Sequence, residues 1–172
     1  MMKASASLKK IILLFALFVA GIACAEETQS TKIFLIRHAP AVSDETNDPG
    51  LTAEGKALAQ RWAAVFASES VSIIYSTDYK RTQQTAQAIA DSQGELPITS
   101  YDPRDFDLEQ LLLEISGKTV VIVGHSNTTP MVANGFLGEE RFAQFDHEQY
   151  GTLIVVQYIG EGPASAAILH FD

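Results

Sequence analysis

Two histidines and two arginines are the residues of this chain whose types best fit a common chemistry. An imidazole is a competent nucleophile when its second ring nitrogen donates a hydrogen bond, and His38 and His125 each lie just after an apolar segment. Arginine binds the equatorial oxygens of a phosphoryl group through a fixed fork of charged donors, and Arg37 and Arg81 are the candidates. The pattern is suited to phosphoryl transfer, with His38 as a candidate nucleophile, Arg37 and Arg81 as candidates for binding the phosphoryl group, and His125 as a second imidazole that could neutralise its charge.

Four further residues are candidates for supporting roles. Ser126 and Asn127 stand at the start of a predicted helix, where backbone amides favour an anion, so we predict that they also bind phosphate. Asp102 and Asp105 follow a predicted strand and are the candidates for the general acid. The sequence does not show which of these two carboxylates is the general acid, because Asp105 is equally suited to capping a helix.

Hydrophobic periodicity predicts strands that alternate with helices over most of the chain. The predicted strands span residues 32–37, 71–75, 96–101, 119–123, 152–159 and 164–171, and the predicted helices run from Thr52 to about Ser68, over 79–92, from a cap at Asp105 through Ile115, and over 128–137. This alternation predicts an α/β fold, a three-layer sandwich with a mainly parallel sheet and an antiparallel C-terminal strand. Ligands of such sheets bind beyond the carboxyl ends of the strands, where Arg37, His38 and His125 stand.

The first 25 residues have the order of a secretory signal peptide. Lys3, Lys9 and Lys10 precede an uncharged apolar run over residues 11–22, and small residues at 23–25 precede a cleavage point after Ala25. The run is shorter than the roughly 20 apolar residues that a membrane-spanning helix needs. We therefore expect residues 1–25 to be a signal peptide, residues 26–172 to be the folded domain, and the protein to be periplasmic or otherwise exported.

Cys24 leaves a second form of export open. It is the only cysteine, so an intramolecular disulfide is excluded, and cleavage after Ala25 would remove it. The alternative is cleavage before Cys24 with lipid attached to it, because residues 21–24 (GIAC) resemble a bacterial lipoprotein signal except for Gly21, where leucine is usual. The alternative localisation is then a membrane-attached lipoprotein with a lipid anchor at Cys24.

Length, composition and charge narrow the class of protein. The 172 residues allow one domain with a short appendage, and 47% hydrophobic against 19% charged residues predict a packed core. A net charge of -9 opposes binding to nucleic acids and to anionic lipid surfaces. We expect a small phosphorylated substrate, no nucleic-acid partner and no cofactor. We also expect no metal site, because the four histidines lack metal-ligand spacing.

Four segments resemble the histidine phosphatase superfamily, which includes phosphoglycerate mutases, acid phosphatases and phosphohistidine phosphatases. In the family's order, they are residues 35–40 (LIRHAP), 51–55 (LTAEG), 75–86 (YSTDYKRTQQTA) and 123–130 (VGHSNTTP). The resemblance implies a phosphomonoester phosphatase in which His38 becomes phosphorylated, Arg37 and Arg81 bind the phosphate, and His125 completes the pocket.

The short body is most similar to the phosphohistidine-phosphatase-like branch of that superfamily. Mutase-type members usually follow their arginine-histidine pair with glycine, threonine and asparagine, whereas this chain has Ala39, Ala41 and Asp44. Only 43 residues separate Arg81 from His125, and a strand and a helix use most of them. We therefore expect an open pocket without a lid, and the sequence does not select the phosphorylated substrate.

Two other functions remain as alternatives. Residues 124–128 (GHSNT) resemble the GxSxG elbow of serine hydrolases, with Ser126 as nucleophile and with Asp146 and His147 or His170 later in the chain. However, Thr128 replaces the last glycine, and this function leaves Arg37, His38 and Arg81 unexplained. His147 and His170 are better explained as structural residues. The second alternative is a non-catalytic phospholigand-binding protein with the same pocket.

Overall fold

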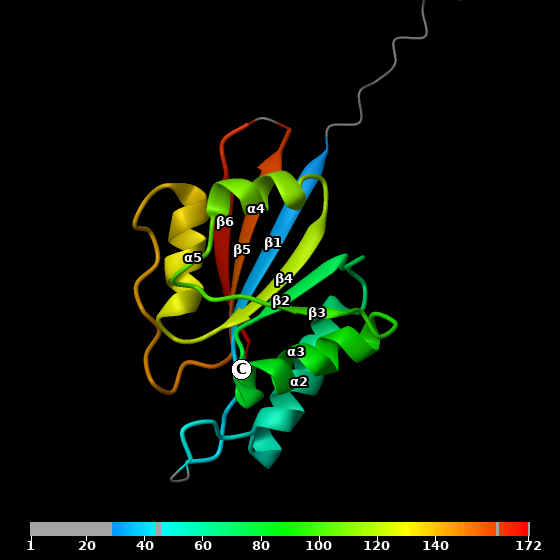
Figure 1. Cartoon of the computed structure of the whole chain (residues 1–172), viewed down its shortest axis with the longest axis vertical. Helices are drawn as coiled ribbons and strands as arrows, with labels where there is room; N and C mark the ends of the chain where they lie inside the picture. The colour runs from blue at the N-terminus through cyan, green and yellow to red at the C-terminus, as the bar shows by residue number, and fades with distance from the viewer. Residues whose placement is uncertain (1–28, 44–45, 161, 172) are drawn as a thin grey trace, which may run out of the picture.

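The computed structural model describes residues 29–43, 46–160 and 162–171, so the expected signal peptide and Cys24 lie outside the described residues. The elements follow one another as β1 (Ser30–Arg37), α2 (Ala53–Phe66), β2 (Ile73–Ser76), α3 (Lys80–Ser92), β3 (Ile98–Ser100), α4 (Leu108–Glu114), β4 (Thr119–Gly124), α5 (Thr128–Leu137), β5 (Thr152–Ile159) and β6 (Ser165–His170) (Figure 1). The predicted alternation of strands and helices is confirmed. No helix among these residues is long and apolar enough to cross a membrane.

The strands form one mixed sheet in the order β3-β2-β4-β1-β5-β6. β1 pairs in parallel with β4, and β2 pairs in parallel with both β4 and β3. β5 runs antiparallel to β1, and β6 runs antiparallel to β5. The predicted α/β fold is therefore confirmed, and both strands of the C-terminal hairpin enter the sheet through antiparallel pairs.

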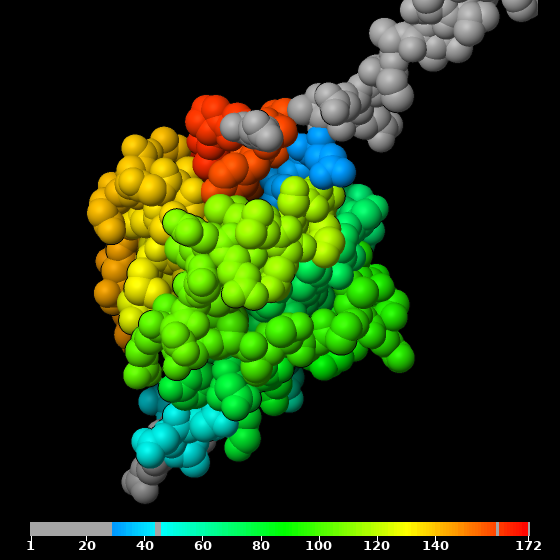
Figure 2. Space-filling view, turned by 45° about the horizontal axis from the view of Figure 1, so that its top comes forward, coloured from blue at the N-terminus to red at the C-terminus, as the bar shows by residue number. Residues whose placement is uncertain are grey.

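Helices cover both faces of the sheet and form the two outer layers of the sandwich. Because neighbouring strand side chains point to opposite faces, β1 places Phe34 and Ile36 against α2 and α3, and Ile33 and Leu35 against α4 and α5. Figure 2 shows α4 and the segment before it over the second face, with α5 beside them. The continuous apolar run of β1 thus reflects a strand that is buried on both faces.

The start of α2 is built as the sequence predicts, and it holds the loop that follows β1. The Thr52 side chain accepts a hydrogen bond from the Gly55 amide at 2.9 Å, and the Thr52 amide donates to the carbonyl of Pro40 at 3.0 Å. A Cβ on Gly55 would lie 2.0 Å from that carbonyl oxygen, so only glycine allows this approach. The contact fixes the chain just after His38.

One predicted helix boundary is wrong. Asp107, not Asp105, caps α4, and its side chain accepts from the Gln110 amide at 3.0 Å. Asp105 instead belongs to a turn in which its amide donates to the carbonyl of Asp102 at 3.1 Å. This turn delays the helix, which begins at Leu108.

Candidate active site

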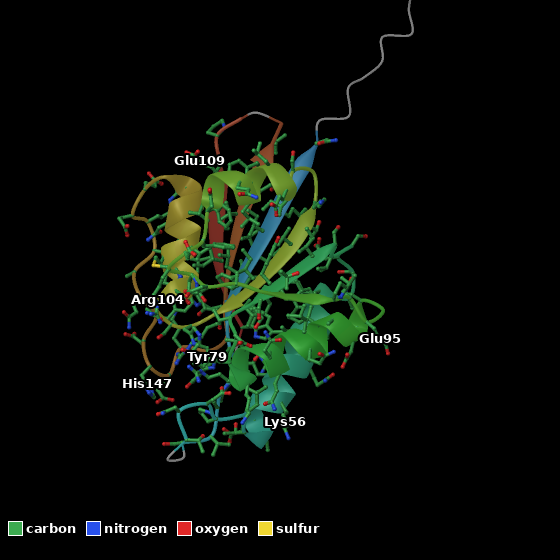
Figure 3. The ribbon with its side chains drawn as sticks, in the orientation of Figure 1. Lys56, Tyr79, Glu95, Arg104, Glu109 and His147 are labelled. Atoms are coloured by element: carbon green, nitrogen blue, oxygen red, sulfur yellow. The ribbon has the colours of Figure 1, made fainter. Side chains whose placement is uncertain are left out.

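A cleft of about 900 Å³ lies at the carboxyl ends of the parallel strands. It is lined by all the predicted catalytic and phosphate-binding residues, which are Arg37, His38, Arg81, His125, Ser126 and Asn127. In Figure 3 the labelled Tyr79, Arg104 and His147, which also line this cleft, lie toward the same end of the molecule, whereas Glu109 lies toward the opposite end. The sheet therefore brings together side chains from the ends of β1 and β4 and from the first turn of α3.

His38 is buried and held in one tautomer. Its Nδ1 lies 2.8 Å from the carbonyl oxygen of Ala39, and since a carbonyl only accepts, Nδ1 carries the proton and donates. The main chain is fixed on both sides, because the His38 amide donates to Gly124 O at 2.8 Å and the Ala39 amide donates to Thr85 Oγ1 at 3.0 Å. The Nε2 lone pair of His38 is left available for attack on an electrophile.

Burial keeps the His38 ring neutral. It lowers the pKa of His38 from 6.5 to about 3, with smaller contributions from His125, Arg37 and Arg81, while the hydrogen bond to Ala39 opposes the shift. At neutral pH the ring therefore has the lone pair that a nucleophile requires.

Arg37 is buried and braced by the loop before β5. Its Nη1 donates to the carbonyls of Asp146, His147 and Gln149 at 3.1, 2.9 and 3.2 Å. Burial is the main reason that the pKa of Arg37 lies below its ordinary value, but guanidinium groups remain charged in proteins. A fixed positive charge thus stands beside His38.

Arg81 presents a second guanidinium to the cleft. It lies over the Tyr79 ring, with Cζ 4.6 Å from the ring centroid, and it makes no ion pair with a carboxylate in the described part of the chain. A pairing with Asp78 would have been the ordinary structural role of this arginine. The guanidinium is instead available for an anionic ligand.

The His125 ring lies beside the His38 ring in an edge-on arrangement, with the ring centroids 5.4 Å apart. Its Nε2 lies 2.9 Å from Thr77 Oγ1. Burial, followed by Arg81 and Arg37, lowers the pKa of His125 to about 4, so this ring is also neutral at pH 7. The two neutral imidazoles and two guanidiniums form a pocket suited to a phosphoryl group.

Ser126 and Asn127 lie between β4 and α5, and Asn127 is the N-cap of α5. The turn is tight because the His125 amide donates to Thr128 Oγ1 at 2.9 Å. A Cβ on Gly124 would meet the hydroxyls of Thr128, Thr129 and Tyr101 within 3.1 Å, which explains the glycine at this strand end. The start of a helix and its amides therefore border the cleft.

The two candidate acids lie in different places. Asp102 lines the cleft, but its Oδ1 accepts from the Arg104 amide at 2.9 Å and shapes the loop. Asp105 is among the residues of a neighbouring pocket of about 370 Å³ and is not among those that line the cleft. The structure therefore brings Asp102, and not Asp105, to the other candidate residues.

Several residues in or beside the cleft could not be identified from the sequence. His147 lines the cleft, although its ring pairs with Glu148 Oε1 at 3.1 Å and is exposed. Thr77 reaches His125 and Tyr150 packs on Arg37, with 3.9 Å between Arg37 Cζ and the ring centroid. Thr77 lies within the matched YSTDYKRTQQTA segment, whereas no pattern marks the other two. His170 lies in β6, bonded to Thr152 Oγ1 through Nδ1 at 3.1 Å.

The described residues contain no group of three or more His, Cys, Asp or Glu side chains placed to hold a metal ion. Nor does any histidine ring among them form a hydrogen bond with Ser126. The geometry expected of a serine hydrolase is thus not assembled around Ser126.

Comparison with known proteins links the chain to one group of enzymes. Residues 33–105 match the model of the histidine phosphatase superfamily, branch 1. A curated relative from Yersinia enterocolitica, the probable phosphoglycerate mutase GpmB, is 36% identical over 89 residues, which cover 48% of this chain and 40% of that protein. The match thus spans less than half the length of the curated relative.

Solved structures extend the likeness to most of the described fold. The protein histidine phosphatase SixA, complexed with tungstate, has a TM-score of 0.63 and 18% identity over 81% of this chain and 96% of its own. Phosphoserine phosphatase from Entamoeba histolytica, in complex with 3-phosphoglyceric acid, has a TM-score of 0.60 and 20% identity over 83% of this chain and 98% of its own. These likenesses confirm the α/β fold that was predicted from the alternation of strands and helices.

Proposed function

We propose that the chain belongs to the histidine phosphatase superfamily, whose model matches residues 33–105, and that it is a phosphomonoester phosphatase that works through a phosphohistidine intermediate on His38. The observation that carries the proposal is the hydrogen bond from His38 Nδ1 to the Ala39 carbonyl. It leaves the Nε2 lone pair in a cleft that also holds Arg37 and Arg81. The substrate class is a small phosphorylated molecule, in line with the structurally similar phosphoserine phosphatase of Entamoeba histolytica, which has been solved in complex with phosphoserine and with 3-phosphoglyceric acid.

The first step transfers the phosphoryl group from the substrate to the protein. His38 Nε2 attacks phosphorus, the bond between phosphorus and the ester oxygen breaks, and that oxygen leaves with its electron pair and takes up a proton. Arg37 and Arg81 stabilise the charge on the equatorial oxygens. The ring becomes cationic, and the Ala39 carbonyl stabilises it by accepting from Nδ1–H.

We assign supporting roles around the transferred phosphoryl group to four further residues. His125 binds the phosphoryl group beside His38, and Ser126 and Asn127 contribute the polar groups at the start of α5. Asp102 is the carboxylate we favour as general acid, since it lines the cleft and Asp105 does not. No cofactor takes part in this scheme.

Export is a separate part of the proposal and rests on the sequence of residues 1–25. The lysines, the short apolar run and the small residues at 23–25 support cleavage after Ala25 and a periplasmic or otherwise exported protein. N-terminal sequencing of the mature protein should begin at Glu26. A lipid-modified Cys24 would establish the lipoprotein form instead, and an intact Met1 would exclude export.

An activity screen tests the proposed function. Purified protein is incubated with phosphomonoesters, sugar phosphates and phosphohistidine peptides, and phosphate release is measured beside the His38→Ala and Ser126→Ala variants. We expect turnover of at least one class, abolished by His38→Ala and mildly reduced by Ser126→Ala. Binding without turnover would favour a phospholigand-binding protein, and loss of activity in Ser126→Ala alone would favour a serine hydrolase.

A further inference from the structure

An aspartate from the segment after β1 caps the start of α3. The N-cap of α3 is Tyr79, whose side chain makes no capping hydrogen bond, and the first turn of the helix contains no acidic residue. The Lys80 amide instead donates to Asp48 Oδ1 at 2.7 Å, across 32 positions of the chain. A carboxylate is a favourable partner there, because the first amides of a helix have no partner within it and form the positive end of its dipole.

Two further hydrogen bonds join the same segment to α3. The Leu51 amide donates to Gln84 Oε1 at 2.7 Å, and the Ala39 amide donates to Thr85 Oγ1 at 3.0 Å. Ala39 directly follows His38 in the chain. The segment that leaves the proposed nucleophile is thus bonded to α3 at its start and again one turn later.

The Asp48 hydrogen bond is placed to control where Arg81 lies. Arg81 Cζ is 4.6 Å from the centroid of the Tyr79 ring, and both side chains line the cleft. The Lys80 amide belongs to the peptide that joins Tyr79 to Lys80, one residue before Arg81. Asp48 therefore fixes the backbone from which the Arg81 side chain reaches the cleft.

Thr82 holds the same turn from within. Its Oγ1 lies 2.8 Å from the carbonyl oxygens of both Thr77 and Tyr79, and the residue is fully buried. These contacts join residues 77–82 to one another, so they shape the turn. The bond to Asp48 adds a tie between this turn and the segment that follows β1.

A precise position of Arg81 matters for the whole site. Its charge contributes to lowering the pKa of both His38 and His125, so the guanidinium acts on both rings. The attraction of a charge for a phosphoryl group falls with distance, and a bidentate contact also requires the correct orientation. A small shift of the first turn of α3 would therefore weaken the contact.

We propose that Asp48 is a positioning residue: through the Lys80 amide, it holds the first turn of α3 so that Arg81 meets the phosphoryl group in the cleft. This inference rests on the proposed function, which gives Arg81 its ligand. Asp48 is not among the residues that line the cleft, so it acts through α3 and not on the substrate.

Amide hydrogen exchange, followed by NMR, tests the capping bond without any substrate. We expect the Lys80 amide to be protected in the wild type and in Asp48→Asn, since asparagine also offers an acceptor oxygen, and to exchange faster in Asp48→Ala. A Lys80 amide that is unprotected in the wild type, or equally protected in Asp48→Ala, would overturn the inference.

Kinetics and phosphate binding test the effect on Arg81. We expect Asp48→Ala to lower kcat/KM and the affinity for inorganic phosphate roughly tenfold, since a misplacement of about 1 Å can cost up to about a hundredfold. Asp48→Asn should restore both. In an Arg81→Ala background, Asp48→Ala should cause no further loss, and an additive loss would show that Asp48 does not act through Arg81.

Asp107→Ala is the matched control. The Asp107 side chain also accepts from an amide at the start of a helix, that of Gln110 at 3.0 Å, but α4 borders the neighbouring pocket and not the cleft. We expect Asp107→Ala to lower Tm about as much as Asp48→Ala and to leave kcat/KM unchanged. An equal fall of kcat/KM in both variants would assign the effect to lost stability and overturn the positioning role.

The outcomes separate this inference from the proposed function. A wild-type protein that neither binds nor releases phosphate overturns the function, and with it the role of Asp48, even where the Lys80 amide is protected. Normal kcat/KM and phosphate affinity in a folded Asp48→Ala variant overturn the positioning role alone.

Discussion

The guanidinium of Arg37 stacks on the ring of Tyr150, with Cζ 3.9 Å from the ring centroid, and the same ring lies 6.0 Å from that of His38. The loop that ends at Tyr150 also supplies the three carbonyls that accept from Arg37 Nη1. A segment from the C-terminal third of the chain therefore holds a residue at the end of the first strand. The geometry of the candidate site therefore depends on this long-range contact as well as on residues 35–40 (LIRHAP).

Replacing Tyr150 should weaken catalysis while the fold persists. We expect Tyr150→Leu to cost about 1–2 kcal/mol in kcat/KM, the range of a partly desolvated cation–π contact, and Tyr150→Phe to cost much less. The checks are kcat/KM on the best substrate of the screen and Tm by circular dichroism. Equal losses in both variants would assign the effect to the hydroxyl and contradict a role for the stacked ring.

Removing either of the two arginines that we propose to bind phosphate should reduce turnover strongly. We expect Arg81→Ala to lower kcat by roughly a hundredfold or more, since it removes a charged donor from the transferring phosphoryl group. Arg81→Lys should recover little, because an ammonium lacks the bidentate fork. Arg104→Ala, at another arginine of the same cleft, is the comparison, and a loss of kcat as large as that of Arg81→Ala would contradict the assignment.

The stability of the protein should fall in mild acid. The folded-state pKa values of His38 and His125 are about 3 and about 4, both below the ordinary 6.5, so the unfolded chain binds more protons between these values. The free energy of unfolding should therefore be highest above pH 6.5 and decrease toward pH 4, by at most about 1.4 kcal/mol per pH unit for each histidine.

Urea unfolding at several pH values measures this dependence. His38→Asn should flatten the decrease, whereas His147→Gln, at an exposed position, should leave it unchanged. An identical pH dependence in wild type and His38→Asn would show that the buried imidazole is not the source.

Activity should not depend on a metal ion, because the arginines already supply the positive charge that a phosphoryl group needs. We expect chelator to leave the rate of phosphate release unchanged. Vanadate, which mimics five-coordinate phosphorus, should inhibit strongly. Activity that is lost in chelator and restored by a divalent cation would contradict this prediction and reveal a metal site.

The sequence alone was sufficient to predict the fold and the residues at the centre of the candidate site. The apolar run of β1 and the Thr52 cap of α2 are local patterns, so they could be predicted residue by residue. The strand-end rule then placed Arg37, His38 and His125 at one edge of the sheet. All three line the cleft in the structure.

Other features depend on contacts that no local pattern encodes. Asp102, Asp105 and Asp107 are equivalent as helix caps in sequence, and only the turn before α4 selects Asp107. Tyr150 and the carbonyls that accept from Arg37 lie in an irregular loop, where periodicity gives no signal. The role of such residues becomes visible only when the sheet brings that loop against β1.

Trapping the phosphorylated protein tests the central claim most directly. Labelled substrate is mixed with wild type, His38→Ala and His125→Asn, quenched without acid, and the labelled peptide is identified by mass spectrometry. We predict a phosphoramidate on His38 that is stable in alkali and lost in acid, and that is absent from His38→Ala. A label on Ser126, or turnover that persists in His38→Ala, would contradict the assignment of His38 as the nucleophile.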